Sequence, residues 1–173
     1  NYCVTLAEEL KKGELRVKVD SREEKTVGWK FNEWELKGVP IRIEVGKREM
    51  ESGELTVFRR DTGEKIKYQK SNIKDNIKIL LEEIQKNLFA KHKKFTEENT
   101  HAVDSYDEFK KIMEGKKGFI HSFWCENAEC EKKIKEETKA TTRVLPLDAK
   151  EEKGNCIYCN KPAIHRWYFA QAY

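Results

Sequence analysis

The sequence predicts a mixed α/β chain that folds as two small parts. Alternating apolar residues predict a strand over 39–45, and apolar residues at helical spacing predict a long helix from Asn72 to about Leu88. A charged and polar stretch at 91–100 separates these elements from a second set of helix and strand patterns. We therefore expect one domain over residues 1–95 and another over 96–173.

The first part alternates helices with short strands that belong to one sheet. Cys3, Leu6 and Leu10 have helical spacing, and Cys3 is expected to be a buried thiol. Alternation at Leu15, Val17 and Val19 predicts a half-buried strand. The remaining expected elements are a polar loop over 20–27, a short helix over 30–37 that Gly38 ends, and strands over 39–45, 55–58 and 66–68.

The second part is predicted to be a smaller α/β domain. Ser105 and Glu108 have the spacing of a capping box and open a short helix. A strand over 118–124 then leads directly into Cys125. The other expected elements are a charged helix over 126–139, a strand over 143–147, a loop over 148–155 and an aromatic-rich strand over 164–173.

Composition favours a globular protein without a membrane span. Hydrophobic residues make up 38% of the 173, charged residues another 38%, and no apolar run reaches the ~20 residues that a bilayer requires. The net charge is +4, and it is uneven: residues 1–95 hold 22 Lys/Arg against 17 Asp/Glu, whereas 96–173 hold 13 against 14. A polyanionic partner would be drawn to the first half. Charged surfaces of this kind are also common on stable proteins with no such partner.

Four of the five cysteines form two close pairs, Cys125/Cys130 and Cys156/Cys159, with 25 residues between the pairs. Two such pairs brought together offer four sulfur ligands in a tetrahedron, which suits a structural Zn²⁺ with no open position for catalysis. A redox dithiol at Cys156/Cys159 and an iron–sulfur cluster are the alternatives. His121 and His165 are conceivable substitute ligands. The odd cysteine count and the lack of a signal peptide argue against a disulfide framework.

Basic and acidic residues are interleaved along 28–64, GWKFNEWELKGVPIRIEVGKREMESGELTVFRRDTGE. Arginine and lysine suit the O6 and N7 acceptors of guanine, and a carboxylate suits its N1–H and N2–H₂ donors. Proteins usually read RNA sequence on splayed, single-stranded loop bases. The pattern therefore favours base recognition over general phosphate binding. Cross-strand ion pairs without any RNA role would give the same pattern.

The same segment resembles the anticodon-binding domain of class II aminoacyl-tRNA synthetases, and most of all the archaeal and eukaryotic type of prolyl-tRNA synthetase. The resemblance extends over essentially all 173 residues. It implies a mixed-sheet anticodon-binding domain followed by a small α/β zinc-binding domain. It also implies that the family's carboxylate and arginine facing the anticodon guanines correspond to Glu35, in Trp34–Gly38, and Arg42.

The resemblance implies further RNA-binding residues. Arg48 and Glu49 match a basic–acidic pair after the next strand, and a more distant lysine is carried over to Lys65 although strict alignment lands on Glu64. The four metal ligands implied are Cys125, Cys130, Cys156 and Cys159. Tyr173 matches the family's terminal tyrosine, whose carboxylate reaches towards the catalytic domain; the alternative is an edge-strand residue with no role in catalysis.

The expected function is therefore that of the tRNA-recognition portion of a cytoplasmic proline–tRNA ligase, a homodimer that uses ATP and Mg²⁺. The expected partners are the anticodon loop of proline tRNA and a catalytic domain of the same polypeptide. We find no class II catalytic motif here, so this stretch alone is expected to be inactive. The alternatives are the equivalent domain of a threonyl, histidyl or glycyl enzyme, and a stand-alone zinc-stabilised interaction module.

Overall fold

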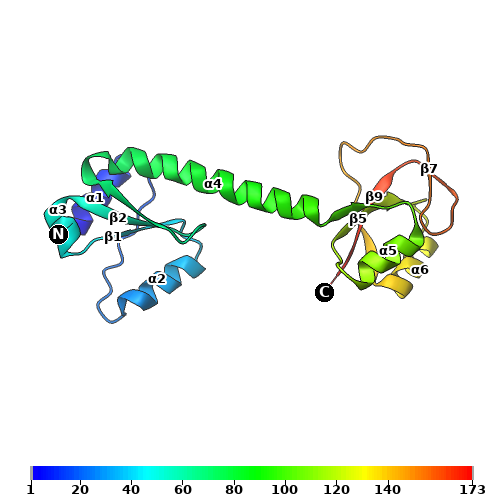
Figure 1. Cartoon of the computed structure of the whole chain (residues 1–173), viewed down its shortest axis with the longest axis horizontal. Coiled ribbons are helices and arrows are strands. Elements are labelled where there is room, and N and C mark those ends of the chain that lie inside the picture. Colours follow the sequence, from blue (N-terminus) through cyan, green and yellow to red (C-terminus); the bar gives the residue numbers. More distant parts are fainter. Residues whose placement is uncertain (1, 173) are drawn as a thin grey trace. The chain divides into compact units, whose positions relative to one another are not determined.

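The structure, a computed structural model, describes residues 2–172 and divides the chain into two compact units (Figure 1). Unit 1 comprises Asn1–Lys91 and unit 2 comprises His92–Tyr173. The division falls inside a long helix, four residues before the boundary predicted from the charged stretch. Tyr173 lies outside the described residues.

Unit 1 is a three-stranded antiparallel sheet with helices around it. Strand order is β1-β2-β3, and Figure 1 shows α4 and α2 on opposite sides of the sheet. The elements are α1 (Tyr2–Lys11), α2 (Val27–Leu36), β1 (Ile41–Glu44), α3 (Lys47–Ser52), β2 (Glu54–Arg59), β3 (Lys65–Gln69), a 3-10 turn (Lys70–Asn72) and α4 (Ile73–Glu98).

The core of unit 1 lies between the sheet and helices α1 and α4. Leu55 and Val57 of β2 are fully buried, so every second side chain of this central strand enters the core. α4 contributes its buried residues at helical spacing, which is the amphipathic pattern seen in the sequence. The cluster is made by Leu6, Leu10, Leu55, Val57, Ile73, Ile77, Leu80 and Ile84.

Three expectations for unit 1 were wrong. The strand expected over 14–19 is absent from the described chain, although Leu15 and Val17 do pack against the core. Their alternation reflects half-burial of an extended segment, which does not require a hydrogen-bonded neighbour. Cys3 is only half-buried. Third, α4 ends at Glu98 and not near Leu88, because the charged and polar residues of 91–98 suit a solvated helix.

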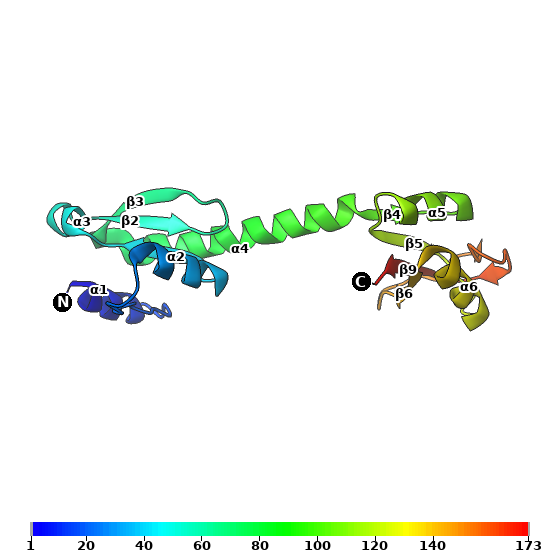
Figure 2. The ribbon, with the colours of Figure 1, turned by 90° about the horizontal axis from the view of Figure 1, so that it is seen from below.

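Unit 2 contains a four-stranded mixed sheet of order β4-β5-β9-β6, in which only β4 and β5 are parallel, and a separate hairpin of β7 and β8. Figure 2 shows the unit from a second direction. Its elements are β4 (Thr100–Ala102), α5 (Tyr106–Glu114), β5 (Phe119–Phe123), α6 (Ala128–Thr138), β6 (Ala140–Val144), β7 (Gly154–Asn155), β8 (Pro162–Ala163) and β9 (Arg166–Gln171).

The core of unit 2 joins one side of this sheet to α5 and α6. Phe109 of α5 and Phe169 of β9 are fully buried and meet edge to face, with ring centroids 5.4 Å apart. Ile120 of β5 and Ile134 of α6 complete the contact. The predicted α/β class is confirmed, whereas β6 begins three residues earlier than expected, at Ala140. The Ser105 side chain makes no capping hydrogen bond.

Within residues 2–172, no helix combines the length and the apolar character needed to cross a bilayer.

Candidate functional site

The α2 face of the unit 1 sheet, defined here by Arg42, Glu44, Phe58 and Lys65, is the side opposite the core. Strand alternation sends Ile41 and Ile43 into the core and Arg42 and Glu44 the other way. Phe58 lies directly opposite Arg42 on β2, and Lys65 lies opposite Phe58 on β3. One row across three strands therefore holds a cation, an aromatic ring and a second cation.

The guanidinium group of Arg42 is held between two aromatic rings. Its Cζ atom lies 3.7 Å from the ring centroid of Phe31, which comes from α2, and 4.1 Å from that of Phe58. Stacking on aromatic faces is a property of arginine that lysine does not reproduce. The Arg42 side chain is only 15% exposed, so the rings fix the plane of the guanidinium.

Two carboxylates share the donors of Arg42. Its Nη1 donates to Glu35 Oε1 at 2.5 Å, while Nε and Nη2 donate to Glu44 Oε1 at 3.1 and 3.0 Å. Lys65 Nζ donates to the other oxygen of Glu44 at 2.8 Å. Burial opposes ionisation of Glu44, but the hydrogen bonds from Lys65 and Arg42 outweigh it and lower its pKa. The face is thus a paired set of two cations and two anions.

The structure favours Lys65 over Glu64 as the residue near Arg42. The Glu64 carboxylate accepts a hydrogen bond from the Thr62 hydroxyl at 3.0 Å, within the turn between β2 and β3. Lys65 is the first residue of β3 and reaches Glu44. A shift of one position moves a strand side chain to the other face, so the two residues cannot substitute for one another.

Arg48 and Glu49 lie in α3, a helix that replaces the turn expected after β1. Glu49 accepts from the backbone N–H of Gly46 at 2.9 Å and from the Thr56 hydroxyl of β2 at 3.2 Å. Backbone hydrogen bonds are the main reason that its pKa is lowered. Arg48 is exposed, and no ion pair joins its side chain to another residue of 2–172. Four of the five candidates therefore meet on or beside the α2 face, and Arg48 is apart from the network.

The cysteine pairs are placed by two short local structures in unit 2. Cys125 follows β5 after one residue, and Cys130 lies in the first turn of α6, where Asn127 caps the helix by accepting from Glu129 N–H at 2.8 Å. Cys156 and Cys159 form a tight turn between β7 and β8. Asn160, with a φ of 56°, closes that turn.

Backbone contacts bring the two turns together. Cys156 N–H donates to Lys161 O at 2.8 Å, and Ile157 N–H donates to Phe123 O at 2.9 Å, which ties the turn to the end of β5. A Cβ atom on Gly154 would lie 2.3 Å from the Phe123 ring, so only glycine allows this approach. The sequence predicted a loop over 148–155, whereas the structure has β7 at the end of that stretch, paired with β8 in a short hairpin.

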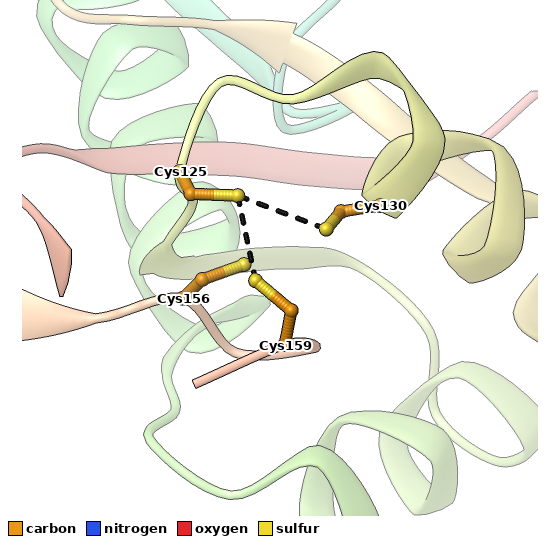
Figure 3. Close-up of side chains that lie close together, drawn as sticks. All are labelled: Cys125, Cys130, Cys156 and Cys159. Atoms are coloured by element: carbon orange, nitrogen blue, oxygen red, sulfur yellow. Dashed lines mark hydrogen bonds between the residues drawn. The ribbon is translucent and has the colours of Figure 1, made fainter. Parts of the chain in front are cut away.

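The four sulfur atoms converge on one point (Figure 3) and all lie within 4.8 Å of one another. The Sγ atoms of Cys125 and Cys130 are 3.7 Å apart, and those of Cys125 and Cys159 are 3.6 Å apart. A tetrahedron of thiolates about 2.3 Å from a zinc ion has edges of about 3.8 Å. Disulfide bonds are far shorter, about 2.05 Å. The cluster can hold a metal ion; His121 and His165 are not among its members.

Without a bound cation, the thiols of the cluster differ in how readily they ionise. Burial raises the pKa of Cys125 and of Cys130. Burial also opposes ionisation of Cys159, but the backbone N–H of Lys161 and the neighbouring thiols outweigh it, so its pKa falls to about 7. Four thiolates this close require a positive charge at their centre, which a divalent metal supplies.

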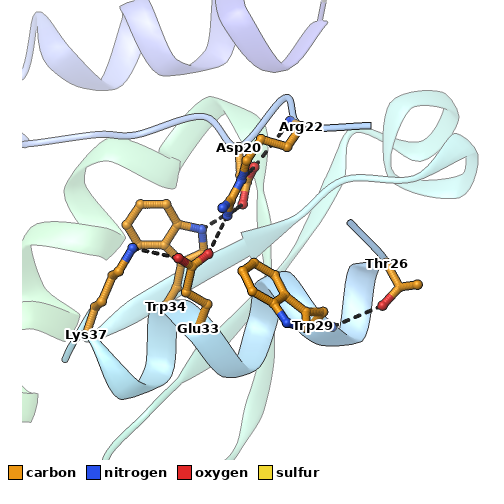
Figure 4. Close-up of polar contacts among 7 residues, drawn as sticks. All are labelled: Asp20, Arg22, Thr26, Trp29, Glu33, Trp34 and Lys37. Carbon is orange, nitrogen blue, oxygen red and sulfur yellow. Dashed lines mark hydrogen bonds and ion pairs between the residues drawn. The ribbon is translucent and has the colours of Figure 1, made fainter. Parts of the chain in front are cut away.

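Unit 1 also contains a second charged network, centred on the segment that the sequence predicted only as a polar loop over 20–27. Figure 4 shows Arg22 between Asp20 and Glu33, with Arg22 Nη2 at 2.6 Å from Asp20 Oδ2 and 2.5 Å from Glu33 Oε2. Trp34 Nε1 donates to Asp20 at 2.8 Å. The hydrogen bonds from Arg22 are the main reason that the pKa of Asp20 and of Glu33 is lowered. This network anchors α2, which carries Glu35 and Phe31.

Comparison with known proteins addresses both units. Residues 1–80 match the anticodon-binding domain family, and residues 106–173 match the family described as prolyl-tRNA synthetase, C-terminal. A proline–tRNA ligase of Natranaerobius thermophilus is 47% identical over 164 residues, which is 94% of this chain. Proline–tRNA ligase 2 of Clostridioides difficile is 46% identical over 165 residues, or 95% of this chain, and the ligase of Flavobacterium johnsoniae is 46% identical over 170 residues, or 97%.

The chain belongs to the prolyl-tRNA synthetases, as a piece of their C-terminal part. It spans about a third of the length of these relatives, 34% in each case. The α2 face lies in the part of the chain that matches the anticodon-binding domain family, and the four cysteines lie in the part that matches the prolyl-tRNA synthetase C-terminal family. The resemblance seen in the sequence is confirmed at the level of both domains.

Proposed function

We propose that this chain is the tRNA-recognition portion of a proline–tRNA ligase and that it reads the anticodon of proline tRNA on the α2 face. The observation that carries the proposal is the stacked guanidinium of Arg42, paired with Glu35 on the side of an anticodon-binding domain opposite its core. A fixed guanidinium beside a carboxylate provides the donors and the acceptor that a guanine edge requires.

Guanine would be read by an exchange of partners. Three of the five N–H donors of Arg42 are directed at Glu35 and Glu44, which leaves one on each terminal nitrogen for O6 and N7 of a base. Glu35 is 37% exposed, so its carboxylate can turn from Arg42 to the N1–H and N2–H₂ groups of guanine. Each ion pair that opens would be replaced by hydrogen bonds to the base.

The other three candidates would act around this pair. Lys65 and Arg48 are exposed cations suited to phosphate or base acceptors, and Arg48 is free to move because it has no ion pair among the described residues. Glu49 is held by the Gly46 backbone and Thr56, which favours a fixed acceptor at the edge of the face. The proline anticodon has two guanines, and Glu35 and Glu49 would offer one carboxylate acceptor for each.

The cysteine cluster would bind a structural Zn²⁺ through Cys125, Cys130, Cys156 and Cys159. When bound, the ion supplies folding free energy to unit 2 and no catalytic position, since four thiolates fill a tetrahedral site. The complete enzyme would add a catalytic domain, use ATP and Mg²⁺ to activate proline, and act as a cytoplasmic homodimer. The role of this chain there is binding energy and positioning of the tRNA.

Replacement of Glu35 tests the reading role directly. Glu35→Ala is expected to cost about 1–3 kcal/mol of binding to proline tRNA with its native anticodon, because the guanine donors lose their acceptor. The melting temperature should hardly change, since a half-exposed ion pair contributes about 0–1 kcal/mol. Isothermal titration and calorimetric melting on the same preparation measure both quantities.

Glu82→Ala, on the exposed side of α4, removes the same charge away from the α2 face and is the control. A Glu35→Ala protein that melts earlier but binds tRNA as before would show that Glu35 and Arg42 form a structural ion pair. That result would favour the alternative of a zinc-stabilised interaction module.

A further inference from the structure

Glu44 contacts both cations of the α2 face at once. One of its carboxylate oxygens accepts from Nε and Nη2 of Arg42, at 3.1 and 3.0 Å, and the other accepts from Nζ of Lys65 at 2.8 Å. Arg42 and Lys65 lie on strands that are separated by β2, so no backbone hydrogen bond sets their spacing. The Glu44 carboxylate is the one group that bridges them among the contacts of residues 2–172.

The two carboxylates on Arg42 differ in how they are held. Glu35 comes from a helix, makes one contact to Arg42 and is 37% exposed. Glu44 lies two residues from Arg42 on the same strand, makes three contacts to two cations and is 20% exposed. Glu44 makes more charge-assisted hydrogen bonds than Glu35 and is more buried. It is therefore the carboxylate that stays bound to Arg42 when an acceptor of a base approaches.

We propose that Glu44 is a positioning residue for anticodon reading, which holds Arg42 and Lys65 in the orientation that a guanine edge requires, while Glu35 is the partner that a base displaces. The inference rests on the proposed function of the α2 face. By occupying Nε and one N–H of Nη2, Glu44 directs the remaining donors of Arg42 away from the strand. It also restrains the side chains of Arg42 and Lys65, which if mobile would contact the phosphate groups of any RNA regardless of its sequence.

If Glu44 positions Arg42 and Lys65 in this way, removal of its charge should change the selectivity between RNAs. Without the Glu44 charge, Arg42 and Lys65 gain freedom and the face gains one net positive charge. Affinity for RNA without guanines should then rise or stay constant, while the preference for the native anticodon should fall. A residue that merely stabilised the sheet would weaken binding to both RNAs by the same factor.

The test compares Glu44→Gln with Glu54→Gln in the 173-residue chain. Glu54 lies on β2 with its side chain on the same side of the sheet, and pairs with Lys67 at 3.1 Å, away from Arg42. The two variants therefore remove the same charge from the same side of one sheet. The probes are the anticodon stem-loop of proline tRNA and the same stem-loop with both anticodon guanines replaced by adenine, at one salt concentration. The quantity compared is the dissociation constant for the guanine-replaced stem-loop divided by that for the native stem-loop.

We expect the ratio to fall by roughly tenfold in Glu44→Gln, the loss of about one bidentate contact, and to be unchanged in Glu54→Gln. Solvent exchange of the Arg42 Nε–H, followed by NMR without RNA, should be faster only in Glu44→Gln. An equal change of the ratio in both variants, or an unchanged ratio in Glu44→Gln, would overturn the positioning role alone. If the parent chain itself shows no preference between the RNAs, the proposed function fails, and the positioning role with it.

Discussion

A chelator that removes metal from the four cysteines is expected to unfold unit 2 while unit 1 remains folded. Unit 2 is a small domain whose core includes Cys130 and Cys156 beside Trp124 and Ile157, so the cluster is part of the core. Zinc binding by such sites is worth roughly 10–16 kcal/mol. That is comparable to the whole stability of a domain, about 5–15 kcal/mol. The loss should therefore exceed what unit 2 can tolerate.

Amide hydrogen exchange resolved by peptide measures this effect, because it reports β5 and β9 of unit 2 separately from β2 of unit 1. Cys130→Ser should reproduce the effect of the chelator. Cys3→Ser, which alters a half-buried thiol of unit 1 outside the cluster, should not. Exchange rates in β5 and β9 that change neither with chelator nor in Cys130→Ser would contradict metal binding by the four cysteines.

Arg42→Ala is expected to weaken RNA binding strongly. The substitution removes the guanidinium between Phe31 and Phe58 and leaves Glu35 and Glu44 without their shared partner. We expect a loss of about 1–3 kcal/mol in binding to proline tRNA, and a loss of discrimination at a guanine. Arg42→Lys should recover little of it, since lysine provides neither the planar group nor the paired donors.

Arg16→Ala serves as the matched control, because Arg16 is an exposed arginine outside the strands of the sheet. Its replacement should produce only a small loss that is the same for every RNA sequence. If Arg42→Ala also weakened binding equally for native and guanine-replaced anticodons, Arg42 would be a phosphate contact and would not read bases.

The elements predicted correctly were those with a long or clean periodicity. The strand around 41–44 alternates core and surface residues, and α4 repeats apolar residues over several turns, so both were evident in the sequence. The segment 14–19 has the same alternation but forms no strand, because half-burial does not identify a hydrogen-bonding neighbour. The helix α3 and the hairpin β7–β8 are too short for any period to be visible.

The sequence predicted the cysteine cluster more completely than it predicted the residues of the α2 face. The spacing of the four cysteines predicted their convergence, since two tight pairs need only one contact between hairpins to meet. The family resemblance pointed to Arg42 and Glu35, and left Lys65 and Glu64 unresolved. The roles of Glu44, Phe31 and Phe58 depend on cross-strand register and on the position of α2, which no local pattern reveals. Period-2 spacing from Arg42 is the one signal that could have suggested Glu44.

We propose above all that this chain reads the anticodon of proline tRNA. The most direct measurement is the affinity of the 173-residue chain for proline tRNA, beside the same tRNA with its two anticodon guanines replaced, at fixed salt. We expect weaker binding after replacement, by roughly 1–3 kcal/mol for each guanine that is read. Equal affinity for the two RNAs would contradict it and would leave only charge-driven binding to the basic first half of the chain.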